Sequence, residues 1–165
     1  MMTACGEKTR TEAETGGNGI ATVPAEKAPA EASPTKTQLD KPTFTAGLPE
    51  GWQEMPGDTD EVLVYKGADI ADAMNGPFII MEVSKLEGTT LAEGLKQLQE
   101  SMGAKPGKDI TIAGQTYKSF TATEDGVEST ILVAEKNGCS IMAAITKAKV
   151  DDPDVQAIVG SIRVK

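Results

Sequence analysis

The 165-residue chain contains no histidine, the side chain that proteins use most often as a general base and as a metal ligand near neutral pH. Catalysis by a serine–histidine–aspartate triad or a cysteine–histidine pair is therefore excluded, as are zinc sites with a histidine ligand. Aromatic residues make up only 4% of the chain. Its core must therefore be built mainly from isoleucine, valine, leucine, methionine and alanine.

Positive charge is also scarce, with 16 lysine and arginine residues against 25 aspartate and glutamate residues and a formal net charge of −9. Binding of nucleic acid and of anionic lipid head groups both require a field of positive side chains. We therefore expect no nucleic acid among the partners and no direct docking on an anionic membrane surface. The six acidic and five basic residues of segment 7–41 nearly cancel, so the negative charge belongs to residues 42–165.

Cysteine occurs only twice, at Cys5 and Cys139, in segments so different that we expect separate roles for the two thiols. Residues 1–6 resemble the end of a bacterial lipoprotein signal, in which a small residue precedes a cysteine that becomes the lipidated first residue of the mature chain. Here Ala4 precedes Cys5 and Gly6 follows it.

We favour a lipid on Cys5 over the alternative, a cysteine that lies near the N-terminus by chance. The basic and apolar regions that define a signal peptide do not precede Cys5, and we expect the sequence to lack the front of its signal. A lipid on Cys5 predicts an extracytoplasmic protein that contacts the membrane through its anchor only.

Residues 7–41 have the composition of a tether. They contain three prolines, only isolated large apolar residues, and no aromatic residue, since the first one is Phe44. Such a segment cannot bury enough apolar surface to offset the entropy lost on ordering. The sequence therefore predicts a disordered tether between residues 1–6 and one folded domain at residues 42–165.

The clearest structural pattern lies at residues 107–146, where short β-type runs alternate with turn signals. Asp125-Gly126 and Asn137-Gly138 are typical of type I′ turns, because these residues tolerate positive φ at both central positions. The pattern predicts an antiparallel meander. Its expected strands are 109–113, 115–123, 127–136 and 139–146.

Residues 89–103 have the pattern of an amphipathic helix. Thr90 and Glu93 have the spacing of a capping box, and Gly103 suits the position that follows a helix. Apolar residues recur on one helical face, which we expect to pack on the sheet. These residues are Leu91, Leu95, Leu98 and Met102.

Other segments show shorter patterns. The nearly continuous apolar run Phe78–Val83 predicts a central strand covered on both faces. Asp152 and Pro153 fit the first positions of a short helix that ends at Val159. The remaining expected elements are a strand at Glu61–Tyr65, a loop at 67–77 with one helical turn at Ile70–Met74, and an edge strand at Ser161–Val164.

Two residues could have a functional role, but the residues around them in the sequence favour a structural one. Trp52, the only tryptophan, could stack on a ligand, but we interpret it as a core anchor beside a proline–glycine corner. Cys139 could be a nucleophile only in an electropositive setting. The nearest bases in sequence are Lys136 and Lys147, and we expect Cys139 to be a partly buried strand residue.

Acidic residues gather in two places that could bind a hard cation. The first group is Asp58, Asp60 and Glu61, and the second is Asp151, Asp152 and Asp154. Neither group follows a calcium-loop pattern, and helix capping explains the second group. We therefore predict no metal site, no cofactor and no catalytic residue.

The order of these features resembles the PsbP-like superfamily. The residues that carry the resemblance are the Leu-Pro-Glu-Gly-Trp entry at 48–52, the capped helix at 90–102, the Ile-x-Ile-x-Gly-x-x-Tyr run at 110–117, and the final Gly-Ser-Ile at 160–162. The superfamily includes a photosystem II extrinsic subunit, a Ran-binding transport factor and many bacterial lipoproteins. The resemblance implies an α+β fold, a central antiparallel sheet flanked by helices in an α/β/α sandwich. Cys5 and the acidic balance point to its bacterial lipoprotein branch.

Two functions follow from these patterns. Because PsbP-like proteins are generally accessory binding proteins, we expect a lipid-anchored extracytoplasmic domain, non-catalytic, that binds or scaffolds a protein or another envelope component. The alternative is a hydrolase or metal-dependent enzyme of the cell envelope. A cleft with converging carboxylates and a bound cation would favour the enzyme, and a smooth surface with an exposed apolar patch would favour the binding domain.

Overall fold

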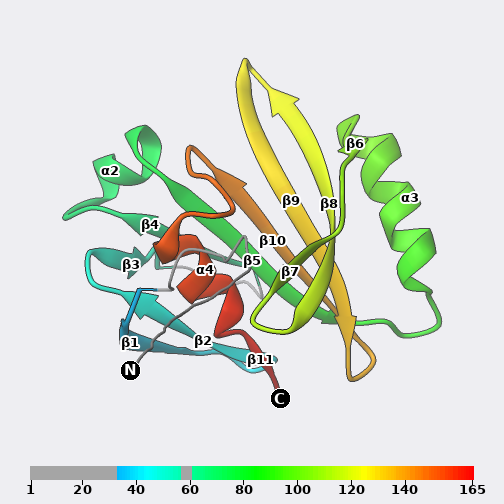
Figure 1. Cartoon of the computed structure of the whole chain (residues 1–165), viewed down its shortest axis with the longest axis horizontal. Helices are drawn as coiled ribbons and strands as arrows, with labels where there is room; N and C mark the ends of the chain where they lie inside the picture. The colour runs from blue at the N-terminus through cyan, green and yellow to red at the C-terminus, as the bar shows by residue number, and fades with distance from the viewer. Residues whose placement is uncertain (1–32, 57–60) are drawn as a thin grey trace, which may run out of the picture. The chain divides into compact units, whose positions relative to one another are not determined.

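The computed structural model describes residues 33–56 and 61–165, whose strands and helices follow one another as in Figure 1. The strands are β1 (Thr35–Asp40), β2 (Phe44–Pro49), β3 (Trp52–Glu54), β4 (Val62–Lys66), β5 (Phe78–Lys85), β6 (Lys105–Pro106), β7 (Ile110–Ile112), β8 (Gln115–Glu124), β9 (Val127–Lys136), β10 (Cys139–Thr146) and β11 (Arg163–Val164). The helices are α2 (Ile70–Asn75), α3 (Leu91–Met102) and α4 (Pro153–Gly160).

All the strand pairs recorded in these two ranges are antiparallel. The larger sheet has the order β3-β4-β5-β10-β9-β8-β6, with β7 paired to β8, and a smaller sheet has the order β1-β2-β11. The fold is therefore α+β, with a mainly antiparallel sheet and few helices, as the sequence predicts.

The predicted meander is confirmed as β7 to β10, and its turns have the expected backbone. In Asp125–Gly126 and Asn137–Gly138 both residues have positive φ, between 52° and 79°, as type I′ turns require. The third turn, Ala113–Gly114, has the same signs, with φ of 51° and 85°. Each residue pair therefore sets the register of the two strands that it joins.

The shorter predictions are confirmed to within a few residues. Strand β4 is displaced by one residue from the predicted Glu61–Tyr65, and the expected helical turn at Ile70–Met74 is α2. The last strand, β11, is shorter than the predicted Ser161–Val164 because Ser161 still caps α4. Turn and cap signals therefore located these elements well.

Strand β10 separates two apolar cores on opposite faces of the larger sheet. Ile141, Ala143 and Ile145 are buried in a core shared with α4 and the smaller sheet. Met142 and Ala144 instead pack against the core beneath α3. Because successive strand side chains point to opposite faces, α4 and α3 lie on opposite faces. On the first face α4 is accompanied by the smaller sheet, so this face is not covered by helices alone.

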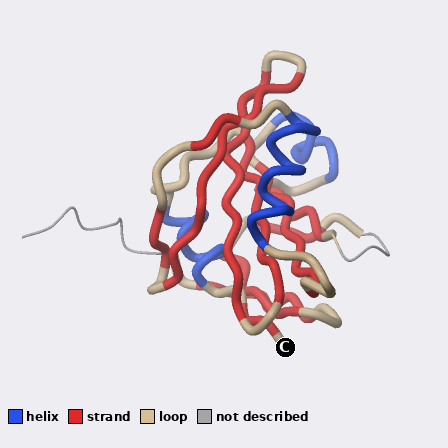
Figure 2. The backbone as a smooth tube through the Cα atoms, turned by 90° about the vertical axis from the view of Figure 1, so that its right-hand side faces the viewer, coloured by secondary structure: helices blue, strands red, loops and turns tan. Residues whose placement is uncertain are grey.

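The two longer helices are packed to different degrees. Val155, Ile158 and Val159 of α4 are at most 1% exposed, so this helix is part of the first core. Helix α3 begins after its predicted cap Thr90 and ends before Gly103, which has φ of 61°. None of its residues is fully buried, and Figure 2 shows it lying along the outside of the strands.

The leucines predicted to face the sheet do so. Leu91, Leu95 and Leu98 are half-buried against the second core. Met102, the last residue of the predicted stripe, is 45% exposed. Helix α3 is therefore held by three side chains along one edge.

The expectation that both faces of β5 are covered is wrong for one face. Ile79, Met81 and Val83 are at most 1% exposed, whereas Phe78 and Ile80 on the other face are only half-buried. The second core that α3 covers is formed by β8, β9 and β10. The apolar run therefore reflects the central place of β5 in the sheet more than complete burial.

The predicted tether at residues 7–41 is wrong for residues 35–40, which form strand β1 on the edge of the smaller sheet. Leu39 is the only buried residue of this strand, so the composition of the segment did not indicate a strand. Its pairing with β2 uses the backbone, and a Cβ at Gly47 would lie 2.7 Å from the Thr35 methyl group. Glycine at this position therefore allows the two strands to approach.

Residues 7–32 of the predicted tether and the predicted lipidation residue Cys5 lie outside the described residues. Within residues 33–56 and 61–165, no helix is both long enough and apolar enough to cross a membrane.

Candidate functional site

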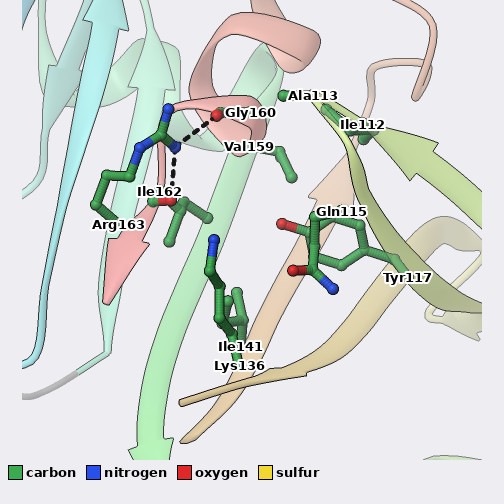
Figure 3. Close-up of a pocket in the computed structure, with 10 residues that line it drawn as sticks. All are labelled: Ile112, Ala113, Gln115, Tyr117, Lys136, Ile141, Val159, Gly160, Ile162 and Arg163. Atoms are coloured by element: carbon green, nitrogen blue, oxygen red, sulfur yellow. Dashed lines mark hydrogen bonds between the residues drawn. The ribbon is translucent and has the colours of Figure 1, made fainter. Parts of the chain in front are cut away.

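A basic pocket lies where the β7–β8 hairpin meets the end of α4. Its volume is about 200 Å³, smaller than the pockets that hold drug-sized molecules. Figure 3 shows the side chains around it. They are Ile112, Ala113, Gln115, Tyr117, Lys136, Ile141, Val159, Gly160, Ile162 and Arg163.

Two local features assemble this pocket. The tight Ala113–Gly114 turn folds β8 back along β7, which places Gln115 and Tyr117 beside the turn. Helix α4 approaches the turn at Gly160, where an added Cβ would lie 3.1 Å from the Ala113 methyl group. A glycine here therefore permits the close contact that forms one wall.

Two cations stand at the pocket. Lys136 ends β9, and Arg163 begins β11, shortly after α4 ends at Gly160. One terminal nitrogen of Arg163 donates to the carbonyl oxygens of Gly160 and Ile162, at 2.9 Å each. These bonds hold the guanidinium in place, and Figure 3 shows its other nitrogens turned away from Lys136 and Tyr117, so Arg163 contributes positive charge to the pocket.

No carboxylate of residues 33–56 and 61–165 neutralises the two cations. Among the described residues neither Lys136 nor Arg163 takes part in a recorded ion pair, and no carboxylate is among the residues that line the pocket. This contrasts with the net charge of −9 for the whole chain. The pocket is therefore a positive site on an acidic protein.

Tyr117 brings a buried hydroxyl to the pocket. Its side chain is nearly inaccessible, with the residue 2% exposed, and Figure 3 shows the phenol oxygen pointing into the pocket on the side of Lys136. Within the described part of the chain this hydroxyl has no hydrogen-bond partner. Burial raises the pKa of Tyr117, with the charge of Arg163 opposing the shift. The phenol is therefore protonated at neutral pH and can donate to a ligand.

Gln115 completes the polar lining. Its side-chain nitrogen donates to the backbone oxygen of Thr116 at 3.1 Å. The side chain is half-buried, and in Figure 3 its amide oxygen lies on the pocket side.

This arrangement is suited to holding an anion. Lys136 and Tyr117 offer N–H or O–H donors, Arg163 adds positive charge, and hydrogen bonds between a charged donor and an oxyanion are among the stronger ones in proteins. The lining offers no carboxylate, thiol or imidazole to act as a general base. Its apolar walls, Ile112 and Val159 among them, are buried.

The residues predicted from sequence lie elsewhere. Trp52 is 5% exposed within the first core, which confirms its interpretation as a core anchor. Cys139 is a free, buried cysteine of β10, 7% exposed, as predicted. Neither lines the basic pocket.

The second acidic group has structural contacts. Asp152 caps α4 by accepting from the Asp154 backbone nitrogen at 2.9 Å. Asp154 accepts from Lys66 at 2.8 Å, from the Trp52 indole at 2.9 Å and from the Ser33 hydroxyl at 2.6 Å. Its two oxygens are thus already used within the fold.

These contacts set the charge state of Asp154. Burial alone would raise the pKa of its carboxyl, but the hydrogen bonds from Lys66, Ser33 and Trp52 outweigh burial and hold the pKa below its ordinary value. The hydrogen bond between Lys66 and Asp154 also raises the pKa of Lys66. Sequence reasoning explained Asp154 only by helix capping and missed this cross-link.

The first acidic group is only partly described. Asp58 and Asp60 lie outside the described residues, and Glu61 is described. Within residues 33–56 and 61–165 no three carboxylates or thiols are grouped so that they could hold a metal ion.

Sequence reasoning did not find the basic pocket. Tyr117 appeared only within the run at 110–117, and Lys136 only as a neighbour of Cys139. Gln115, Lys136 and Arg163 come from three separated segments, and no local pattern marks them as neighbours. The one available hint was a tyrosine in a strand that faces the core.

Comparison with known proteins shows the fold. The chain resembles the solution structure of the cyanobacterial PsbP protein, CyanoP, from Synechocystis sp. PCC 6803, with a TM-score of 0.50, 13% identity, and coverage of 79% of this chain and 93% of that protein. It also resembles a crystal structure from Bacteroides thetaiotaomicron VPI-5482, with a TM-score of 0.50, 14% identity, and coverage of 74% of this chain.

The chain spans only 45% of the Bacteroides protein. No protein-family model matches the sequence, and no curated protein matches it either. At such low identity the two structures establish a PsbP-like fold, as the sequence resemblance predicts, and no more.

Proposed function

We propose that this protein is a non-catalytic binding domain of the cell envelope, and that it recognises an anionic group of its ligand or partner in the basic pocket. The observation that carries the proposal is a cavity without a carboxylate that Lys136 and the buried Tyr117 hydroxyl line together with the positive charge of Arg163. A buried hydroxyl without a partner is costly to the fold. A ligand oxygen would satisfy it.

The size of the cavity limits what enters. A volume of about 200 Å³ accommodates a small acid or the acidic end of a larger partner. Lys136 and Arg163 make the pocket positive, whereas the protein as a whole is negatively charged. An anionic ligand is therefore attracted to the pocket and repelled by acidic parts of the surface.

We place the domain outside the cytoplasm, held at a membrane by a lipid on Cys5. The support is the Ala-Cys-Gly sequence at residues 4–6 and the PsbP-like fold, whose superfamily includes many bacterial lipoproteins. The proposal also includes membership of that lipoprotein branch. It includes as well the α/β/α sandwich of the superfamily, with helices on both faces of the sheet.

The enzyme alternative, a hydrolase or a metal-dependent enzyme, has no observation in its favour among the described residues. The pocket lining presents hydrogen-bond donors and contains no carboxylate, thiol or imidazole. We therefore propose binding alone.

The proposal is tested by calorimetric titration of the protein with acetate and with phosphate at constant ionic strength. We expect saturable binding of at least one of them, and a loss of about tenfold or more in affinity in Lys136→Gln, since a charged donor is removed. Lys105→Gln is the matched control, because Lys105 is exposed on β6, outside the pocket, and the change in net charge is the same.

Two results would contradict the proposal. One is the absence of saturable binding of either anion by the unmodified protein. The other is an equal loss of affinity in Lys136→Gln and Lys105→Gln, which would assign the binding to net charge.

A further inference from the structure

Gln115 gives the basic pocket an acceptor that faces the same space as its donors. The backbone oxygen of Thr116 can only accept, so the group that contacts it at 3.1 Å must be the side-chain NH₂ of Gln115. The amide oxygen is then left on the other side, and Figure 3 shows it directed toward the pocket beside the Tyr117 phenol.

The placement of this oxygen discriminates among anions. An anion held by Lys136 and Tyr117 near the charge of Arg163 lies near the Gln115 oxygen, because these residues line the same small cavity. If the ligand has only acceptor oxygens, two sets of lone pairs face each other and the amide oxygen loses its contact with water. A ligand that carries its own O–H group removes this conflict by donating to Gln115.

We propose, resting on the function proposed above, that the pocket selects a small oxyanion that also carries a hydrogen-bond donor. An α-hydroxy carboxylate and a protonated phosphate both have this chemistry. In either case the charged oxygens contact Lys136 and Tyr117, with the charge of Arg163 nearby, and the hydroxyl donates to the amide oxygen of Gln115. Gln115 is thus the residue that determines specificity.

Two pairs of probes isolate the donor. Glycolate and acetate are carboxylates of the same charge that differ by one hydroxyl, and phosphate and sulfate are tetrahedral oxyanions of which only phosphate retains a proton near neutral pH. Affinities are measured by titration calorimetry at constant ionic strength with the full chain. We expect at least one donor-bearing probe to bind about tenfold more tightly than its counterpart, the size of one hydrogen bond.

The variant Gln115→Met keeps the length of the side chain and removes the acceptor. We expect it to bind both members of each pair equally. Gln97→Met is the control, since Gln97 is exposed on α3. Thermal unfolding of both variants shows whether each is folded, and the preference ratio is a readout that a structural defect alone does not change.

Each outcome tests a different part of the inference. A preference for glycolate identifies a hydroxy acid, and a preference for phosphate identifies a protonated phosphate; either supports the inference when it disappears in Gln115→Met. Equal binding within both pairs overturns the inference and leaves the proposed anion site intact. A preference that persists in Gln115→Met overturns the role of Gln115. If no probe binds, the proposed function fails together with the inference.

Discussion

Single side chains decide both the stability of this domain and its proposed chemistry. Asp154 connects the start of α4 to Lys66 of β4, to Trp52 of β3 and to Ser33 at the beginning of the described chain. Its side chain is 14% exposed, so these hydrogen bonds are largely shielded from water. Segments that are distant in sequence are therefore held together at one carboxylate.

Asp154→Asn is expected to destabilise the domain by about 1–2 kcal/mol at pH 7, because a charged acceptor with three donors becomes neutral. Since the folded-state pKa of Asp154 lies below its ordinary value, its stabilising effect is complete above the unfolded-state pKa near 4 and is lost as the pH falls through the folded-state pKa. Urea unfolding at pH 7 and at about pH 3 measures the effect.

The control for this experiment is Asp151→Asn, an exposed neighbour. The difference in unfolding free energy between the unmodified protein and Asp154→Asn should shrink at the lower pH, and Asp151→Asn should behave like the unmodified protein throughout. A difference that is independent of pH would contradict the assignment to the ionised carboxylate.

Tyr117→Phe separates ligand binding from folding. The ring stays in the core and the hydroxyl, which has no partner among the described residues, is removed. We expect an unfolding free energy equal to or slightly above that of the unmodified protein, because burial of an unsatisfied hydroxyl costs free energy. Anion affinity, measured by calorimetry, should fall. A clear loss of stability with unchanged affinity would show that the hydroxyl serves the fold.

At the scale of elements, the chain contrasts a tightly packed helix with a loosely packed one. Helix α3 has no buried residue and contains Gly94, where an added Cβ would meet nothing within 4 Å. Gly126 is equally open to an added Cβ but lies in a type I′ turn with φ of 79°. Both positions therefore have room for a methyl group, and the backbone conformation is what distinguishes them.

Alanine at these two positions should act in opposite directions. Gly94→Ala is expected to stabilise the domain by about 0.5–1 kcal/mol through helix propensity, and Gly126→Ala to destabilise it, because alanine is strained at positive φ. Chemical denaturation of both variants provides the measurement. Destabilisation by Gly94→Ala would mean that the helix needs glycine there for a contact that the structure does not contain.

The elements that were predictable from sequence are those with local causes. The Asp125–Gly126 and Asn137–Gly138 turns and the Thr90 cap determine conformation within a few residues, so β8 to β10 and α3 were correctly located. Strand β1 was missed because its pairing uses backbone groups and only Leu39 is buried. The basic pocket was missed because its residues meet only after the hairpin and α4 pack together.

The whole molecule combines an acidic domain with a single predicted anchor point. Residues 42–165 carry nearly all of the −9 net charge, which opposes direct adsorption to an anionic membrane. Attachment to the membrane would therefore depend on the proposed lipid at Cys5, and an anionic ligand would be directed to the basic pocket.

Substitution of Cys5 tests the anchor. Expressed in its native host with its complete signal, the protein should fractionate with membranes, and Cys5→Ala should appear in the soluble or secreted fraction, because the substitution removes the proposed apolar anchor. Cys139→Ser should fractionate like the unmodified protein. Membrane association that is unchanged in Cys5→Ala would contradict the lipid anchor.

The central claim, that the basic pocket binds an anion, is tested most directly by an NMR titration of the ¹⁵N-labelled protein with phosphate and glycolate at constant ionic strength. We predict saturable shifts of the backbone amides at residues 112–117, at Lys136 and at residues 159–163, and their disappearance in Lys136→Gln. Shifts that do not saturate, or that gather on a surface away from these residues, would contradict the claim.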